Sequence, residues 1–353
     1  MPESFILKPD DPILITGAAG FIGNEVVQSL LKHGLRHLRL FVRPTSKAVK
    51  LEALAARQPE GTRIEIIRGN LLSREDCERA VKDVAVVFHL AAGTGEKSFP
   101  AAFMDSVVTT RNLLDASVNH TSLRRFVNVS SFTVYTNRNN RKWRVLDESC
   151  AVEEHPHHRG DAYCFAKVKQ DEIVREYGEK FGLPYVIVRP GSVFGPGKAS
   201  ITGRVGIGTF GVFLHLGGSN RIPLTYVDNC AELIVLAGLK PGVDGEVFNA
   251  VDDDLPSSRQ FLRLYKRRVK PFRSIYVPHV LSFSLCYLWE KYSSWSQGQL
   301  PPAFTRSRWH CEWKKTCYSN AKAKSLLGWV PKTSMEEGLN RYFEDCLERG
   351  GRA

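Results

Sequence analysis

The stretch that decides the fold is residues 13–23, which read ILITGAAGFIG. The apolar run at 13–15 predicts a buried strand, and residues 21–32 follow it with the apolar spacing of a helix. Three glycines separate them in the pattern G-x-x-G-x-x-G: the first suits a tight turn, the second a close approach to a pyrophosphate, and the third close helix–strand packing. The start of the helix adds partial positive charge. A dinucleotide is therefore expected to contact Gly17, Gly20, Phe21, Ile22 and Gly23.

Short apolar runs continue to alternate with helical stretches through the first half of the chain. The runs lie at 38–42, 64–67, 85–90, 126–129 and 185–188. This alternation predicts an α/β fold with a Rossmann-type doubly wound parallel sheet. After about Gly195 the alternation weakens, which predicts a smaller C-terminal substrate-binding cap. We expect residues 1–190, with interleaved segments near 226–250, to form the dinucleotide-binding domain, and residues 191–353 to form mainly the cap and a C-terminal extension.

Composition narrows the class of protein. Of 353 residues 43% are hydrophobic, which supplies a core and argues against disorder. The sequence has no apolar run of about 18 residues and no leader-like N-terminal segment, so neither a spanning helix nor a signal peptide is expected. Eight scattered cysteines without a C-x-x-C pair suggest reduced thiols in a cytoplasmic protein and no metal site. The net charge of +12 suits anionic partners such as a phosphorylated cofactor.

The end of the second expected strand bears on the choice of cofactor. Residues 41–47 read FVRPTSK, so Arg43 stands where an acidic residue would accept a hydrogen bond from a free ribose 2′-hydroxyl. The planar guanidinium of Arg43, with Lys47 nearby, suits a 2′-phosphate. NADP(H) is therefore the preferred cofactor and NAD(H) the alternative. Stacking of Arg43 on the adenine is the alternative role for this side chain.

A serine, a tyrosine and a lysine form the predicted catalytic set. Ser131 follows the strand run at 126–129, and Tyr163 and Lys167 share one face of an expected helix at i and i+4. The Lys167 ammonium should lower the pKa of Tyr163 from about 10, so that the phenol acts as general acid or base on an alcohol or ketone. Ser131 would donate to the same substrate oxygen, and Lys167 would also hold the nicotinamide ribose.

Together these segments resemble the extended short-chain dehydrogenase/reductase superfamily, also called the NAD-dependent epimerase/dehydratase family. Further matching stretches are GNL at 69–71, HLAA at 89–92, RPGSVFGP at 189–196, YVD at 226–228 and LGWVP at 327–331. The resemblance implies that Ser131, Tyr163 and Lys167 are catalytic. It also implies cofactor contacts at Ala91, Ala92 and Pro190, and contacts to the adenine at Asn70 and Leu71. Ser106 stands where the family has Asn. Members are often dimeric, which predicts a homodimer.

Several positions bear on the reaction within that family. Phe132 and Thr133 stand where sugar-nucleotide dehydratases carry an acidic pair, which argues against elimination of water. Ile222 and Pro223 occupy the place of a pyrophosphate-gripping arginine in epimerases, although Arg204 and Arg221 could serve. The apolar, glycine-rich segment 207–218 suits a hydrophobic or amphipathic substrate, as in the resembling hydroxysteroid dehydrogenases and ketone reductases, or else forms the core of the cap.

We therefore expect an NAD(P)-dependent oxidoreductase that interconverts a secondary alcohol and a ketone of a small molecule by hydride transfer. The alternative is an NAD-dependent sugar-nucleotide epimerase that retains its cofactor. A remote alternative is a non-catalytic cofactor-binding scaffold.

Residues 266–295 carry a further hypothesis. A basic cluster at 266–273 leads into an aromatic-rich apolar stretch that is too short to span a bilayer but suits its interface. Peripheral membrane contact is one interpretation, and a buried cap helix with a basic flank is the other.

Two other stretches of the sequence bear on nucleic-acid and metal binding. The basic stretch 137–144 follows the catalytic strand, so a substrate- or phosphate-contacting loop is favoured over a nucleic-acid site. The tract His155–His158 lacks completing metal ligands and suggests a substrate-entrance loop.

Overall fold

The computed structural model describes residues 5–93, 98–138, 144–198, 200–209, 211–296, 299 and 304–350. Residues 139–143, most of the basic stretch for which a substrate-contacting loop is predicted, lie outside the described residues.

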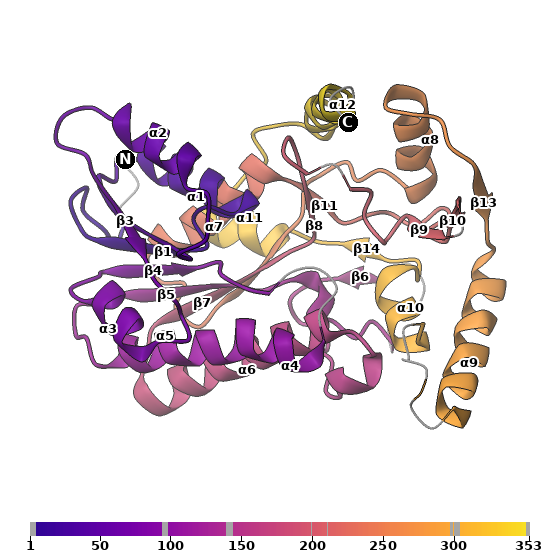
Figure 1. The fold of residues 1–353 in the computed structure, drawn as a ribbon, viewed down its shortest axis with the longest axis horizontal. Coiled ribbons are helices and arrows are strands. Elements are labelled where there is room, and N and C mark those ends of the chain that lie inside the picture. Colours follow the sequence, from indigo (N-terminus) through magenta and orange to yellow (C-terminus); the bar gives the residue numbers. More distant parts are fainter. Residues whose placement is uncertain are drawn as a thin grey trace.

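A seven-stranded parallel sheet forms the centre of the fold (Figure 1). Its strands are β1 (Ile13–Thr16), β2 (His37–Val42), β3 (Arg63–Arg68), β4 (Val86–His89), β5 (Arg125–Val129), β7 (Tyr185–Pro190) and β12 (Val247–Ala250). Their order is β12-β7-β5-β4-β1-β2-β3, and every neighbouring pair is parallel. Strands β1, β4 and β5 are buried along their whole length, as a sheet covered on both faces requires. The predicted doubly wound α/β fold is confirmed.

Helices cover both faces of this sheet. On one face lie α3 (Arg74–Val81), α5 (Thr109–Val118) and α6 (Ala162–Phe181) (Figure 1). On the other lie α1 (Phe21–Lys32), α7 (Val227–Leu239) and α11 (Ala321–Leu327). Helix α2 (Val49–Ala56) connects β2 to β3. Helix α4 (Phe99–Ala102) directly precedes a π-helical segment, Phe103–Val108. Trp329 ties the C-terminal part to α7, because its ring N–H donates to the Asn229 carbonyl at 3.0 Å.

The strand order reverses between β1 and β4. From β1 the chain proceeds outward to β2 and β3, then returns to place β4 on the other side of β1. The loops after β1 and β4 therefore diverge at the carboxyl edge of the sheet. Ligands of open α/β sheets bind in the crevice at this reversal point.

The remaining elements form small sheets and helices that lie beyond the carboxyl edge of the seven-stranded sheet (Figure 1). The strands are β6 (Val145–Leu146), β8 (Ser192–Phe194), β9 (Gly206–Thr209), β10 (Val212–His215), β11 (Leu224–Tyr226), β13 (Ser274–Tyr276) and β14 (Cys317–Tyr318). The helices are α8 (Ser258–Arg268), α9 (His279–Trp295), α10 (Arg306–Glu312) and α12 (Met335–Gly350). As expected for an interleaved segment, residues 226–250 return to the sheet with α7 and β12. The division into domains at 190 stays a prediction.

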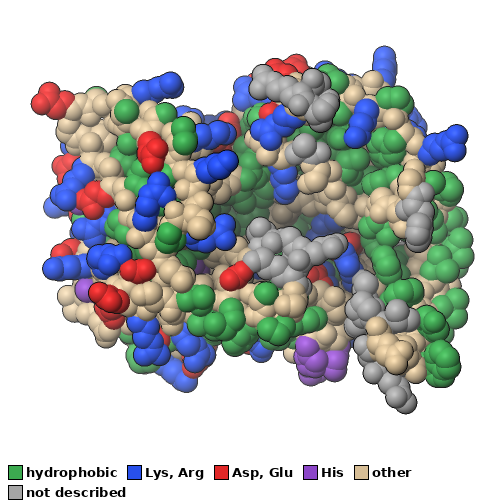
Figure 2. Space-filling view, viewed as in Figure 1, with side chains coloured by type: hydrophobic (Ala, Val, Ile, Leu, Met, Phe, Trp, Pro, Cys, Tyr) green, Lys and Arg blue, Asp and Glu red, His purple; other side chains and the backbone are tan. Residues whose placement is uncertain are grey.

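Helix α9 departs from the interpretation as a buried cap helix. Its buried residues are small, Ser282, Cys286 and Ser293. Phe283 packs against buried Trp309, but most of the large apolar side chains face outward, with Val280 81% and Trp295 77% exposed. Figure 2 shows hydrophobic side chains gathered on the surface over α9 and β13. Among the described residues, no helix has both the length and the apolar character needed to cross a membrane.

Candidate active site

The glycine loop after β1 is built as a cradle that side chains would fill. Gly17 has a φ of +71°, and a Cβ there would lie 2.9 Å from the Ala91 backbone nitrogen. A Cβ on Gly23 would lie 2.2 Å from the Gly17 carbonyl oxygen. Gly20 is the N-cap of α1 and brings no side chain to cap it, which leaves first-turn amides open to an anion. The loop therefore fits the pyrophosphate of a dinucleotide.

A cleft of about 1210 Å³ opens over this loop. It lies along the carboxyl ends of the central strands, and Figure 2 shows the hollow between the two halves of the molecule. The predicted catalytic and cofactor-binding residues all line it: Gly17, Gly20, Phe21, Ile22, Gly23, Arg43, Asn70, Leu71, Ala91, Ala92, Ser131, Tyr163, Lys167 and Pro190.

The end of the cleft beside β2 carries the residues expected at the adenosine. Arg43 and Lys47 are exposed there, and the Arg43 carbonyl accepts from the Ser46 amide at 2.9 Å in a tight turn. The Asn70 side chain accepts from the Leu72 amide at 3.0 Å, which shapes the turn after β3. The side chains of Arg43 and Lys47 thus bring two positive charges to the carboxyl end of β2.

A buried polar network lies behind the cofactor loops, and sequence reasoning did not find it. The two ring nitrogens of His89 bond to the hydroxyls of Thr16 at 2.8 Å and Thr110 at 2.9 Å. Burial lowers the pKa of His89 to about 3, so its ring is neutral and serves one hydroxyl as donor and the other as acceptor. Thr16 also accepts from the Ala91 amide at 3.3 Å, and Ser106 accepts from the Gly93 amide at 2.9 Å. The network fixes the loop after β4 against the glycine loop.

The predicted catalytic residues converge from two elements. Ser131 lies two residues after the end of β5 and caps a short 3-10 turn, accepting from the Thr133 amide at 3.2 Å. Tyr163 and Lys167 stand on the first turns of α6, which begins where Asp161 accepts from the Tyr163 amide at 3.0 Å. A hydrogen bond joins the Tyr163 and Ser131 side chains.

The ionisation of these residues differs from the sequence expectation. Burial raises the pKa of Tyr163 to about 12, and the hydrogen bond with Ser131 only partly offsets this. Lys167 does not lower it: its Nζ lies 6.0 Å from the tyrosine ring centroid and donates to the Val129 carbonyl at 2.7 Å. Burial lowers the pKa of Lys167 itself to about 8. The protein therefore presents a protonated phenol, poised as a donor.

The opposite end of the cleft is charged. Arg159, Asp161, Arg204, Arg308 and Glu312 all line it. Arg204 was among the residues proposed from the sequence, whereas Arg221 is exposed and does not line the cleft. Arg159 and Arg308 were missed, because nothing in their spacing links them.

Two further expectations concern the cap. The described residues of 207–218, which exclude 210, do not line the cleft, and Ile207 and Leu214 pack with buried Trp309 and Trp313. This segment is therefore cap core and not a substrate pocket. The tract His155–His158 forms a turn, and the described residues hold no cluster of potential metal ligands.

Comparison with known proteins places this site in a family. Residues 13–250 match the NAD dependent epimerase/dehydratase family. The chain is 29% identical over 250 residues to an uncharacterized UDP-glucose epimerase, YtcB, of Bacillus subtilis, covering 67% of this chain and 75% of that protein. It is 24% identical over 351 residues to 3beta-hydroxysteroid-dehydrogenase/decarboxylase isoform 1 of Arabidopsis thaliana, covering 94% and 78%.

Among solved structures, the fold resembles UDP-glucuronic acid 4-epimerase from Bacillus cereus, determined with UDP-glucuronic acid and NAD. The TM-score is 0.71 at 23% identity, over 96% of this chain and 99% of that one. At this identity the likeness shows the fold.

The fold and the family match define one class, the extended short-chain dehydrogenases/reductases, which work with a nicotinamide dinucleotide. The chain belongs to the NAD-dependent epimerase/dehydratase family, and it is an enzyme, a nicotinamide-dependent short-chain dehydrogenase/reductase or epimerase as predicted.

Proposed function

We propose that the protein interconverts a secondary alcohol and a ketone by hydride transfer. The observation that carries this proposal is the hydrogen-bonded pair of Ser131 and Tyr163, with Lys167 one helical turn away, inside the cleft that begins at the glycine loop. No carboxylate stands at positions 132 and 133, so this part of the site offers no group for the elimination of water.

Each residue has a role in the reducing direction. A substrate carbonyl oxygen would enter between Ser131 and Tyr163 and take a hydrogen bond from each. Tyr163 would give its proton to this oxygen as the carbonyl carbon becomes a carbinol, and its high pKa keeps that proton in place at neutral pH. Lys167, held by the Val129 carbonyl, would bind the cofactor ribose. A nicotinamide cofactor held in the cleft would supply the hydride in this direction.

The cofactor end supports a finer proposal, a preference for NADP(H). The exposed guanidinium of Arg43 and ammonium of Lys47 stand where a 2′-phosphate would lie. The family description names NAD, so NAD(H) remains the competing cofactor.

A second candidate function is epimerisation of a sugar nucleotide with the same residues. The similarity to the UDP-glucose epimerase favours it. An epimerase must retain its cofactor between half-reactions, whereas a reductase exchanges it in every cycle.

Nucleotide release separates the two functions. The purified protein is denatured, any released nucleotide is identified, and untreated protein is titrated with NADPH and NADH. Our proposal predicts little bound nucleotide and tighter binding of NADPH. Stoichiometric NAD⁺ retained by the purified protein would favour the epimerase function. If neither NADPH nor NADH bound, both proposed functions would be contradicted.

The surface of α9 supports a separate proposal, contact with an anionic membrane surface. Leu285 and Leu288 are each more than half exposed, and Lys270 and Arg273 stand exposed just before the helix. We expect co-sedimentation with anionic vesicles at low salt and its loss in the double variant Leu285→Asp/Leu288→Asp. Absence of binding by the unaltered protein would refute it. Homodimer formation stays a prediction.

A further inference from the structure

Arg159 is a buried arginine that lies just before the helix carrying Tyr163. It ends the turn Pro156–Arg159, and α6 begins at Ala162, three residues later. The Arg159 side chain is 1% exposed. Burial of a charged group is costly unless neighbouring groups pair with it and bond to it. An arginine buried at this place therefore needs partners on the elements around it.

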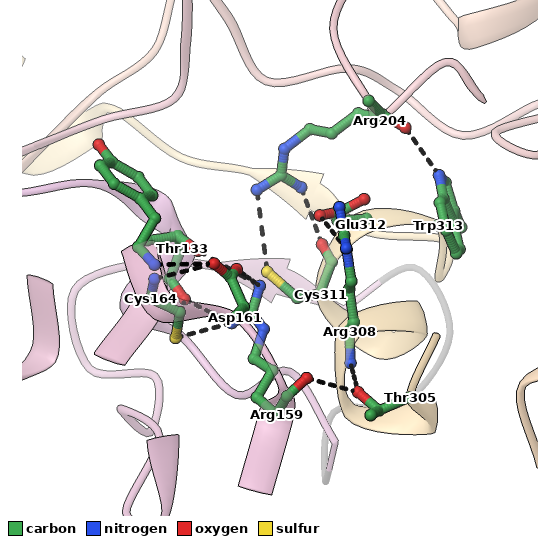
Figure 3. Close-up of polar contacts among 12 residues, drawn as sticks. Thr133, Arg159, Asp161, Cys164, Arg204, Thr305, Arg308, Cys311, Glu312 and Trp313 are labelled. Carbon is green, nitrogen blue, oxygen red and sulfur yellow. Dashed lines mark hydrogen bonds and ion pairs between the residues drawn. The ribbon is translucent and has the colours of Figure 1, made fainter. Parts of the chain in front are cut away.

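The guanidinium of Arg159 joins the two elements that carry the catalytic pair. Toward the turn after β5, Nη1 donates to the Thr133 carbonyl at 2.5 Å and Nη2 to the Thr133 hydroxyl at 3.3 Å. Toward α6, Nη1 donates to the Cys164 sulfur at 3.2 Å, and Nη2 lies 3.7 Å from the carboxylate of Asp161, the N-cap of that helix. Figure 3 shows these three residues gathered around Arg159. The planar guanidinium thus links the turn to the helix with a fixed geometry.

Ser131 and Tyr163 belong to the same ring of contacts. Ser131 accepts from the Thr133 amide at 3.2 Å, so the residue that Arg159 holds also fixes the catalytic serine. Cys164 follows Tyr163 in the chain, and its thiol donates to the Thr133 carbonyl at 3.2 Å. The hydrogen bond between the Ser131 and Tyr163 side chains closes the ring. A change at Arg159 therefore reaches that hydrogen bond through Thr133 on one side and through α6 on the other.

The cap is attached to the same arginine. The hydroxyl of Thr305, the N-cap of α10, donates to the Arg159 carbonyl at 2.8 Å (Figure 3). We propose that Arg159 is a positioning residue that holds Ser131 and Tyr163 in hydrogen-bonding geometry. It acts through Thr133 and α6 and takes no part in the proton transfer. This inference rests on the proposed function for the roles of the catalytic pair, but the hydrogen bond itself can be followed without turnover.

The test is fluorine NMR of protein whose tyrosines are replaced by meta-fluorotyrosine. The resonance of Tyr163 is the one that Tyr163→Phe removes, and Ser131→Ala shows how far this resonance moves when the hydrogen bond is lost. We expect Arg159→Met to move it in the same direction, by roughly half as much or more, and to add little in the Ser131→Ala protein. Such non-additivity is expected when both substitutions act on one hydrogen bond. Equal shifts by Arg159→Met with and without Ser131 would contradict the proposal.

Arg125→Met is the matched control for a general loss of stability. Arg125 is also 1% exposed, but it is the first residue of β5 and lies outside the cleft. Its substitution should lower the midpoint of urea unfolding, as Arg159→Met does, and leave the Tyr163 resonance in place. An equal shift of that resonance in both arginine variants would overturn the proposal, because destabilisation alone would then account for it.

Two variants of Thr133 test the same contact without removing a buried charge. Serine keeps the hydroxyl that accepts from Nη2 and valine does not, so only Thr133→Val should shift the Tyr163 resonance. A resonance that stays in place in Arg159→Met, or in Thr133→Val where Arg159→Met does not fold, would overturn the proposal. Failure of the proposed reaction shows differently: Tyr163→Phe would then keep its rate of hydride transfer, while the shift caused by Arg159→Met would remain.

Discussion

Replacing Gly23 by Ala tests how the cofactor loop is built. Gly23 lies in the first turn of α1, directly over the turn that follows β1. A Cβ there would lie 2.2 Å from the Gly17 carbonyl oxygen and 2.9 Å from the Ala18 Cα. Both are backbone atoms, so no side chain can rotate away to relieve the overlap.

Two opposing effects set the magnitude. Alanine favours a helix over glycine by roughly 0.5–1 kcal/mol. The overlap requires α1 to move away from the loop by roughly 1 Å, and such overpacking costs about 1–3 kcal/mol. The steric cost wins, so we expect a net loss of stability of roughly 1–2 kcal/mol. Since the first-turn amides of α1 shift from the phosphate position, cofactor affinity should fall about tenfold or more.

Gly34→Ala is the matched control at the other end of the same helix. Gly34 has a φ of +79° and nothing within 4 Å of a built Cβ, so this change tests backbone strain without overlap. It should cost about 1 kcal/mol of stability and leave cofactor affinity unchanged. Urea unfolding and titration with NADPH and NADH measure both effects. A Gly23→Ala protein that binds cofactor as tightly as the unaltered enzyme would refute the assigned role of the loop.

Three further predictions concern the ionisable residues of the site. The folded-state pKa of His89, about 3, is depressed below the ordinary 6.5, so the stability that its neutral ring contributes is present above pH 6.5 and lost as the pH falls toward 3. His89→Gln should flatten this dependence in urea unfolding from pH 7 to 4, and an unchanged slope would count against the network. Arg43→Gln should weaken NADPH about tenfold and NADH much less, whereas equal losses would remove the case for a 2′-phosphate. The Lys167 pKa of about 8 predicts that turnover falls above pH 8 as the ammonium deprotonates, and Lys167→Arg should move that fall to higher pH; a rate profile identical in both proteins would contradict it.

The sheet and the cofactor side of the cleft were largely predictable from the sequence. Short apolar runs predict the parallel strands, and the glycine spacing predicts the cofactor loop. Both features depend on residues that lie close together in the sequence. The i and i+4 spacing likewise placed Tyr163 and Lys167 on one helix face. Their pKa shifts were not predictable, because burial outweighs the expected charge effect and Lys167 is held by the Val129 carbonyl.

The substrate side depends on contacts that spacing does not reveal. Arg159, Arg204 and Arg308 are far apart in the sequence and meet only when the cap folds against α6. The segment 207–218 shows the opposite error. Its apolar composition suggested a substrate pocket, yet Ile207, Leu214 and Leu216 pack in one cluster with the buried Trp313. An apolar composition indicates that a segment will be buried. It does not indicate whether a ligand or the rest of the protein will cover that segment.

Hydride transfer by the Tyr163→Phe variant tests whether Tyr163 donates the proton in the proposed reaction. The substrate is selected by screening ketones and alcohols, including anionic ones, and the rate is followed through the nicotinamide absorbance. We expect a loss of turnover of at least about 100-fold with cofactor affinity changed only a few-fold, because the variant removes the proton donor and leaves the glycine loop intact. A Tyr163→Phe enzyme that turns over at the unaltered rate would contradict it.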